Sequence, residues 1–169
     1  MSGSTLSNRP RWVYTCPIVW NAQQATAAGD YGWHQLGNLG LANGNTGGML
    51  VEIDPADYDV YDMATNFYLE ALVGSGDTTP GGTWYLTLFP VTAPTGTSSA
   101  RTTTLGTEVP GARSTTWSTP AANTIDPLRR GPNFTLSAAG LYIPVVHLSA
   151  AWTALTYMTG QFRIAAVPV

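Results

Sequence analysis

The chain has 169 residues, of which 44% are hydrophobic and 11% aromatic, enough apolar material for one packed domain. Only 10% of the residues are charged, against about 25% in typical globular proteins. The many aromatic residues exclude a disordered chain, and the formal net charge of -3 argues against nucleic-acid binding, which requires a basic face.

The N-terminal residues are small and polar and predict an extended arm over residues 1–11, followed by a single β-sandwich domain over residues 12–169. The first strand is expected from Trp12 to Trp20, where Pro17 restricts it to a sheet edge or a bulge. No positive segment followed by an apolar one opens the chain, and no apolar stretch has the length of a membrane span. We therefore expect synthesis in the cytoplasm and no membrane association.

The segment from residue 21 to 48 is rich in Gly, Asn, Ala and Gln. Because structureless loops of that length are rare in compact domains, one short strand is expected near residues 33–39. Another strand is predicted over residues 49–53. Asp54 should then cap a short helical turn whose first residue is Pro55.

Two stronger strands are predicted at residues 66–73 and 83–92. The Gly- and Pro-rich residues 74–82 separate them and have the composition of a turn or loop, so we predict a hairpin. Within the second strand, Trp84 and every second residue up to Leu88 share one face, which is expected to form core.

The Thr- and Ser-rich residues 95–119 predict Thr-lined strands at the surface. A strand or loop is expected at residues 124–128, and the last strands at residues 141–148 and 161–167. Helical periodicity is limited to single turns, one of them near residues 150–155. About eight to ten short strands are thus expected, which predicts an all-β, jelly-roll-like antiparallel β-sandwich.

Half of the acidic residues fall within residues 52–62, a composition that can supply oxygen ligands to a hard cation such as calcium. These acids are Glu52, Asp54, Asp57, Asp59 and Asp62. Their spacing lacks the Gly and the closing Glu of an EF-hand loop. We favour the reading as a strand end, a helix cap and a solvated turn, with calcium as the alternative.

Two carboxylates facing each other across a cleft would suit glycoside hydrolysis, and Glu52 and Glu70 are the only acidic candidates on predicted strands. A glutamate on a strand is more often a surface residue or an ion-pair partner, here of Arg163 or Arg101. We therefore expect no catalytic pair.

Other reactive side chains are scarce. His34 and His147 are too few for a recognisable metal motif, and the single Cys16 can form no internal disulfide. The sequence also lacks a nucleophile elbow and a phosphate-binding loop. We predict a protein that is not an enzyme and that needs no cofactor and no metal.

The chain from Asn66 onward resembles β-sandwich, jelly-roll-like modules of structural proteins of tailed bacteriophages. The resemblance is carried by residues 67–71, 84–92, 106–108 and 162–167. It implies a virion protein, with a capsid decoration protein that stabilises the head preferred over a tail accessory protein. It also implies a homotrimer whose partners are the major capsid protein or other virion subunits. The insertion at residues 119–140 and the Gly-rich residues 21–48 depart from the usual pattern, so the resemblance assigns no functional residue.

The low charge has two readings, a surface covered by other proteins or a surface that uses Thr and Ser in place of Lys and Glu. Under the first reading, six residues of the arm, the first strand and the loops are candidates for partner contact. They are Arg9, Arg11, Trp12, Trp33, Trp117 and Trp152. The last three could instead stack on sugar rings, which makes a carbohydrate-binding module that attaches to surface glycans the alternative function.

Overall fold

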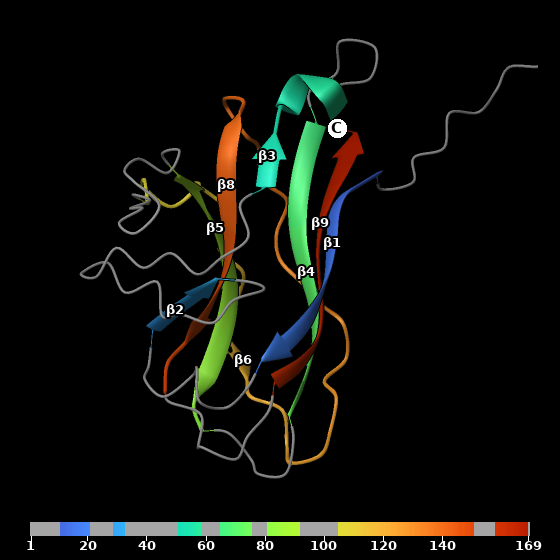
Figure 1. Cartoon of the computed structure of the whole chain (residues 1–169), viewed down its shortest axis with the longest axis vertical. Coiled ribbons are helices and arrows are strands. Elements are labelled where there is room, and N and C mark those ends of the chain that lie inside the picture. Colours follow the sequence, from blue (N-terminus) through green and yellow to red (C-terminus); the bar gives the residue numbers. More distant parts are fainter. Residues whose placement is uncertain are drawn as a thin grey trace, which may run out of the picture.

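The computed structural model describes residues 11–20, 29–32, 51–58, 65–75, 81–91, 105–150 and 158–168. These residues form nine strands and one short 3-10 helix, arranged in two antiparallel sheets that face each other (Figure 1). The elements are β1 (Arg11–Trp20), β2 (Gly29–Gly32), β3 (Val51–Ile53), η2 (Pro55–Tyr58), β4 (Thr65–Ser75), β5 (Thr83–Val91), β6 (Trp117–Ser118), β7 (Arg129–Arg130), β8 (Gly140–Leu148) and β9 (Met158–Pro168). The predicted all-β sandwich is confirmed.

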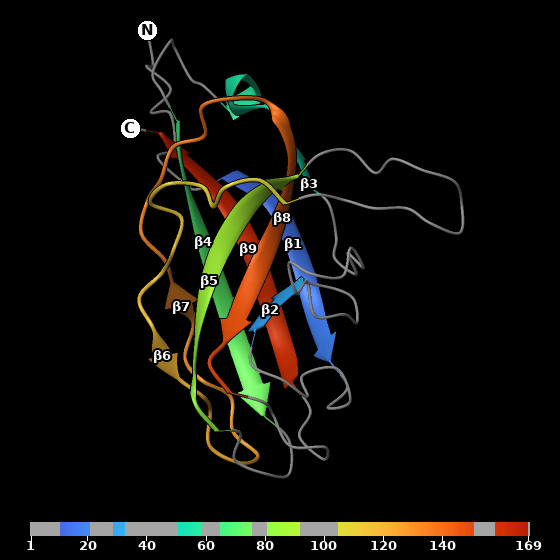
Figure 2. The same cartoon turned by 90° about the vertical axis from the view of Figure 1, so that its left-hand side faces the viewer.

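The first sheet has the strand order β1-β9-β4-β7, and the second has the order β2-β8-β5-β6, with β3 also pairing with β8. Figure 2 shows β5 and β8 crossing in front of β4, β9 and β1. Neighbours in each sheet are distant in sequence. The sandwich is therefore held together by long-range pairing, above all by β4 and β9, whose register runs from Thr65 opposite Pro168 to Ser75 opposite Met158.

Strand β1 pairs with β9 along its whole length and is the end strand of the first sheet. The register shifts between Trp12 and Tyr14. Pro17, which has no backbone N–H to donate to a neighbouring strand, thus lies on an end strand, as its residue type predicts.

The predicted hairpin of the two strong central strands is wrong. Strand β4 pairs with β9 and β7 in the first sheet, whereas β5 pairs with β8 and β6 in the second. The chain between them therefore passes from one sheet to the other. Each strand turns one face toward the core in either arrangement, so alternation alone does not distinguish a hairpin from a crossing between sheets.

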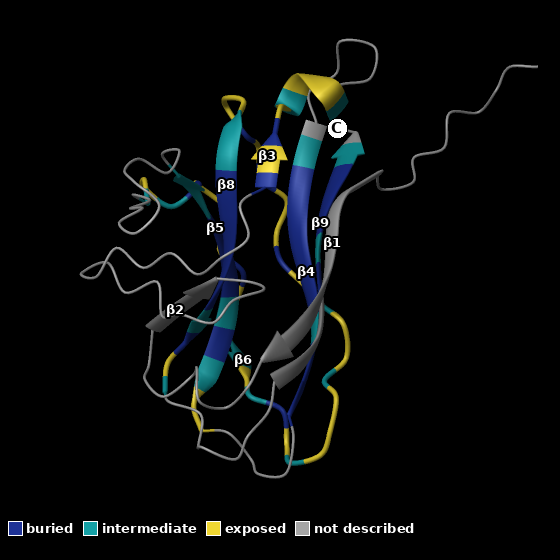
Figure 3. Cartoon of the chain, viewed as in Figure 1, coloured by how far each residue is buried: buried dark blue, intermediate teal, exposed yellow. Residues whose placement is uncertain are grey.

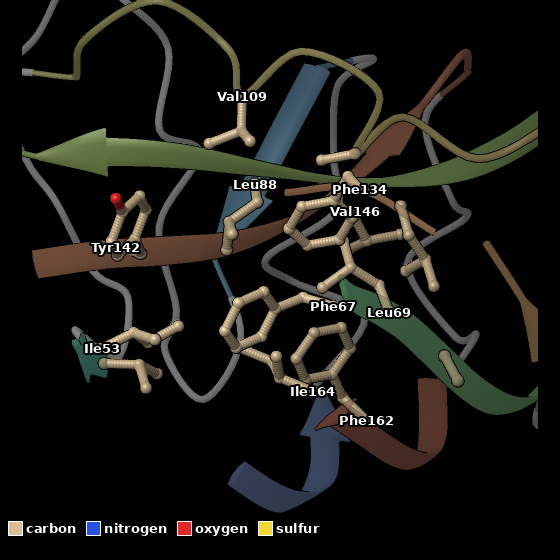
Figure 4. Close-up of a cluster of buried hydrophobic side chains, with 14 of the residues drawn as sticks. Ile53, Phe67, Leu69, Leu88, Val109, Phe134, Tyr142, Val146, Phe162 and Ile164 are labelled. Atoms are coloured by element: carbon tan, nitrogen blue, oxygen red, sulfur yellow. The ribbon is translucent and has the colours of Figure 1, made fainter. Parts of the chain in front are cut away.

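The core fills the space between the sheets, where side chains from β4 and β9 meet those from β5 and β8 (Figure 4). Phe67 and Phe162 from one sheet and Trp84 and Leu88 from the other are fully buried. Burying each such side chain is worth about 1.5 to 3 kcal/mol relative to leaving it exposed. The predicted core face of the strand that begins near Trp84 is confirmed.

Strand β8 is buried on both faces, because residues 142–146 are all buried (Figure 3). Ile143 and Val145 point away from the main core and form a second apolar cluster on the outer side of the sheet, against Phe89, Val91 and Leu105. A continuous apolar run in place of strict alternation is typical of such a doubly covered strand.

The Thr-lined strands predicted for residues 95–119 are wrong where the structure describes the segment. Residues 105–116 contain no regular strand, and only the two residues of β6 follow. Pro110 has no N–H for a ladder, and Gly111 has a φ of 78°, so the backbone turns at this point.

Residues 105–136, which we call the edge segment, cover one edge of the sandwich. The segment first follows β5, with the Val109 amide donating to the Leu88 carbonyl at 2.9 Å. It then returns along β4, where Phe134 and Phe67 exchange backbone hydrogen bonds of 2.7 and 2.8 Å. Four of its apolar side chains join the core, those of Val109, Ala112, Phe134 and Leu136. The segment therefore closes the core at the side of β5 and β4.

The predicted cap is confirmed, because the Asp54 carboxylate accepts a 3.0 Å hydrogen bond from the Ala56 amide at the start of η2. Arg11, placed in the arm by prediction, begins β1, and residues 1–10 lie outside the described part of the chain. The strand expected near residues 33–39 also lies outside it, and β2 ends just before. Within the described ranges, no helix is long and apolar enough to cross a membrane.

Candidate functional surfaces

Three of the six predicted contact residues belong to described elements. Arg11 and Trp12 begin β1, and Trp117 begins β6. These strands end the two sheets at opposite edges of the sandwich, as Figure 2 shows. The structure therefore does not bring them together into one surface. The other three, Arg9, Trp33 and Trp152, lie outside the described residues.

Trp117 is half-buried and packs against Trp84, with ring centroids 4.8 Å apart and planes inclined by 53°. The Trp84 indole donates a 3.1 Å hydrogen bond to the Ser118 carbonyl, which fixes β6 beside β5. Part of the Trp117 ring is thus engaged with the core. Only its remaining surface is available to a partner or a sugar.

The outer face of the first sheet carries a compact polar group that we call the arginine face: Tyr68, Glu70, Arg130 and Arg163. Glu70 lies between the two arginines in the register, since it is opposite Arg163 on β9 and Arg130 on β7. Arg163 donates a 3.2 Å hydrogen bond to the Glu70 carboxylate, whose side chain is only 5% exposed. The Arg130 guanidinium lies 3.8 Å over the Tyr68 ring.

Burial and the negative charge of Glu70 raise the pKa of the Tyr68 hydroxyl, while Arg130 and Arg163 oppose that effect. Tyr68 therefore stays neutral at physiological pH. The Arg130 guanidinium lies over the ring of the buried Tyr68, and the Arg163 guanidinium contacts the buried Glu70 carboxylate. What this face presents to solvent is guanidinium, not carboxylate.

Two exposed apolar side chains lie on the part of the edge segment that follows β4. Ile125 is 63% exposed and Leu128 is 49% exposed, and they are the large hydrophobic residues that stand out from the described surface. Asp126 lies between them in the sequence and forms an ion pair with Arg129, with 3.4 Å between carboxylate oxygen and guanidinium nitrogen. The Asp126 amide donates to the Val73 carbonyl at 2.8 Å, which anchors this stretch to β4.

A second polar group, the Glu108 cluster, lies where the edge segment follows β5 on the second sheet. Arg113 donates two hydrogen bonds to the Glu108 carboxylate, of 2.9 and 2.5 Å, and the buried Thr87 hydroxyl donates a third. Arg113 also lies 4.8 Å over the Tyr85 ring, which stacks on His147 with centroids 4.5 Å apart. The cluster ties residues 108–113 to β5 and β8.

Burial alone raises the pKa of the Glu108 carboxyl, but the hydrogen bonds from Arg113 and Thr87 outweigh it, assisted by the charges of Arg113 and His147. The net result is a lowered pKa. Glu108 is therefore ionised in the folded protein and serves as an anchor for the edge segment.

The two strand carboxylates considered for catalysis do not converge. Glu52 is exposed on β3 of the second sheet, whereas Glu70 is buried among arginines on the outer face of the first. The predicted pairing of Glu70 with Arg163 is confirmed. This pair of glutamates cannot act together across a cleft.

The acidic residues near β3 are described only in part. Glu52, Asp54 and Asp57 are exposed on β3, at the cap and in η2, while Asp59 and Asp62 lie outside the described residues. No group of metal-ligating side chains occurs among the residues that the structure describes. The three described acids fit the favoured reading as a strand end, a cap and a turn.

Sequence reasoning missed the arginine face and the exposed pair Ile125 and Leu128. Arg130 reaches Glu70 through a two-residue strand, too short to leave a recognisable pattern. The signal that was available is the composition of residues 125–130, where Ile, Leu and two Arg stand together in an otherwise charge-poor chain.

Comparison with known proteins adds no identity. No protein-family model matches the sequence, and no curated protein is significantly similar to it. The function therefore has to be argued from these surfaces alone.

Proposed function

We propose that the protein is a non-enzymatic structural protein of a virion, most simply a capsid decoration protein that binds where shell subunits meet. The observation that carries the proposal is the low charge of the chain, in which only 10% of the residues are charged. Among the described residues, Glu70, Glu108 and Asp126 each form an ion pair with an arginine. Glu70 and Glu108 lie on the outer faces of the two sheets. A charge-poor surface suits permanent contact with neighbouring subunits.

We infer a jelly-roll topology from the strand order. The order β1-β9-β4-β7 facing β2-β8-β5-β6 places the first strand beside the last, and apart from the neighbours β2 and β3 and the pair β5 and β6, successive strands lie in different sheets. Two interlocking Greek keys of eight strands give such an order when the short β2 and β3 together count as one strand beside β8. This fold supports the phage resemblance, although the same fold hosts many other functions.

The number of copies per particle tests the proposal. Purified virions would be separated by gel electrophoresis and the protein quantified against the major capsid protein. Decoration predicts a copy number in a simple ratio to the shell subunits. A handful of copies per virion would favour a tail accessory protein, and complete absence from particles would refute the virion assignment.

A carbohydrate-binding module is the second candidate, because Trp117 is half-buried and is followed in the chain by the exposed Ser118 and by Thr119, whose hydroxyl donates to the Gly82 carbonyl. Aromatic surface beside hydroxyl groups is a common composition for sugar stacking. A glycan array separates the candidates: binding that is lost in Trp117→Ala supports the module, and an array without signal excludes it.

A further inference from the structure

We propose that the exposed residues Ile125 and Leu128, which we call the apolar pair, anchor the chain in an apolar groove of the shell, at a place where shell subunits meet. The inference rests on the proposed function, to which it adds the part of the molecule that touches the shell and the apolar character of that contact. Three observations carry it: the exposure of the pair, the fixed backbone beneath it and the engaged charges beside it.

The apolar pair is exposed in a chain that otherwise covers its large apolar side chains. Ile125, 63% exposed, and Leu128, 49% exposed, are the exposed large hydrophobic residues in the part of the chain that the structure describes. By contrast, Ile143 and Val145 on the outer side of β8 are fully buried, although they lie outside the main core. Apolar side chains that are left uncovered next to each other mark a surface suited to binding.

The backbone that carries the apolar pair is fixed before any partner binds. Ile125 forms a β-bridge with β4, and the Asp126 amide donates to the Val73 carbonyl at 2.8 Å. Pro127 restricts its own φ, and Leu128 is followed directly by β7. The two side chains are therefore held at a constant spacing, and binding would cost little backbone entropy.

The ionic groups beside the apolar pair are already engaged within the chain. Asp126 and Arg129 form an ion pair of 3.4 Å, and the Arg130 guanidinium lies over the Tyr68 ring. The exposed neighbours of the pair in the sequence are uncharged: Asn123, Thr124 and Pro127. An apolar centre with neutral surroundings has the charge-depleted composition of an interface core, so an apolar partner suits it better than a charged one.

The small size of the apolar pair and its position on an edge select the partner. The edge segment follows the outside of the sandwich beside β6 and β7 (Figure 2). Two such edges in a two-fold dimer would join only two large apolar side chains from each copy, whereas a stable interface buries about 1,200 to 2,000 Å² and uses about 20 to 30 residues a side. A groove encloses an edge and contacts its neighbouring residues as well. Under the proposed function such a groove lies between shell subunits, so the shell and not a second copy is the occupant.

Binding of the full chain to shells that lack it tests the inference. The probe is the shell of the parent virus, assembled without this chain and sedimented with increasing amounts of it. Ile125→Ser combined with Leu128→Ser should weaken binding about tenfold or more, because the apolar surface is lost. Ile125→Leu combined with Leu128→Met keeps that surface and should bind within about twofold of the parent chain. Ala139→Ser, at an exposed position before β8, is the control, and melting curves check that every variant is folded.

Salt separates an apolar contact from an ionic one. The affinity should stay constant or rise between roughly 0.05 and 0.5 M salt, because salt screens exposed charges and does not weaken apolar contacts. An affinity that falls with salt, or equal binding of the parent chain and the double serine variant, would overturn the inference and leave the proposed function intact. A dimer in solution that the double serine variant abolishes would also overturn it, since the occupant would then be a second copy. Shells that never bind the parent chain would refute the proposed function together with this contact.

Discussion

Phe134→Ala tests whether the irregular edge segment is a structural part of the core. Phe134 is only 4% exposed and packs against Phe67, with ring centroids 6.2 Å apart. Replacing a buried phenylalanine by alanine costs about 3 to 5 kcal/mol, since the loss of transfer free energy and the cavity add together. For a chain of this size, 1 kcal/mol lowers Tm by about 2 to 4 °C, so a decrease of about 6 to 20 °C is expected.

Urea unfolding followed by tryptophan fluorescence measures the free energy directly, because the buried Trp84 reports on the opening of the core. Thr135→Ala is the matched control, as it lies next in sequence, is exposed, and should change the stability by no more than about 0.5 kcal/mol. A loss below about 1 kcal/mol for Phe134→Ala would show that the segment lies on the surface without completing the core, and would refute the closure of this edge by Phe134.

Two further predictions concern single contacts of the fold. Because the pKa of Glu108 is lowered in the folded protein, its ion pair stabilises the fold above the unfolded pKa of about 4.3, and this stabilisation is lost as the pH falls through the folded pKa. Glu108→Gln should therefore make the urea midpoint depend less on pH between about pH 6 and pH 3. An unchanged slope would contradict the role of Glu108 as an ionised anchor. Gly82→Ala should destabilise the protein by about 2 to 4 kcal/mol, because φ is 81° and the new Cβ would lie 2.6 Å from the Ser149 hydroxyl oxygen. Gly111→Ala, where φ is 78° and the nearest atom to the new Cβ is 3.5 Å away, should destabilise it by only about 1 kcal/mol. Equal melting temperatures for the two variants would contradict this difference.

The strands that sequence predicts well are those whose side chains alternate or form a long apolar run. Strands β4, β5, β8 and β9 all occur within a few residues of the predicted positions. Their pairing was less accessible, since a Gly- and Pro-rich connection after Ser75 serves a hairpin and a crossing between sheets equally well. The partner of each strand depends on contacts between distant residues, which a local pattern does not record.

The edge segment was the part that sequence predicts least well, because it is held by backbone hydrogen bonds from residues whose side chains show no strand pattern. Gly131 donates to the Leu69 carbonyl at 2.8 Å and Ser114 to the Leu86 carbonyl at 2.9 Å, yet neither residue type indicates a strand neighbour. Prolines and glycines in such a segment interrupt the regular ladder, which also protects the sheet edges from pairing with other chains. The composition that suggested surface loops thus belongs to a segment that completes the core.

The structure explains part of the low charge of the chain without a binding partner. The outer side of β8, where alternation would place polar residues, instead carries Ile143 and Val145, which are fully buried against Phe89 and Leu105. The chain itself covers this apolar surface, so no partner is needed to explain it. What remains for a partner is the edge at Ile125, where exposed apolar and arginine side chains occur together. Since Arg129 on that edge is ion-paired with Asp126, the exposed side chains of Ile125 and Leu128 are what distinguishes the edge from the rest of the described surface.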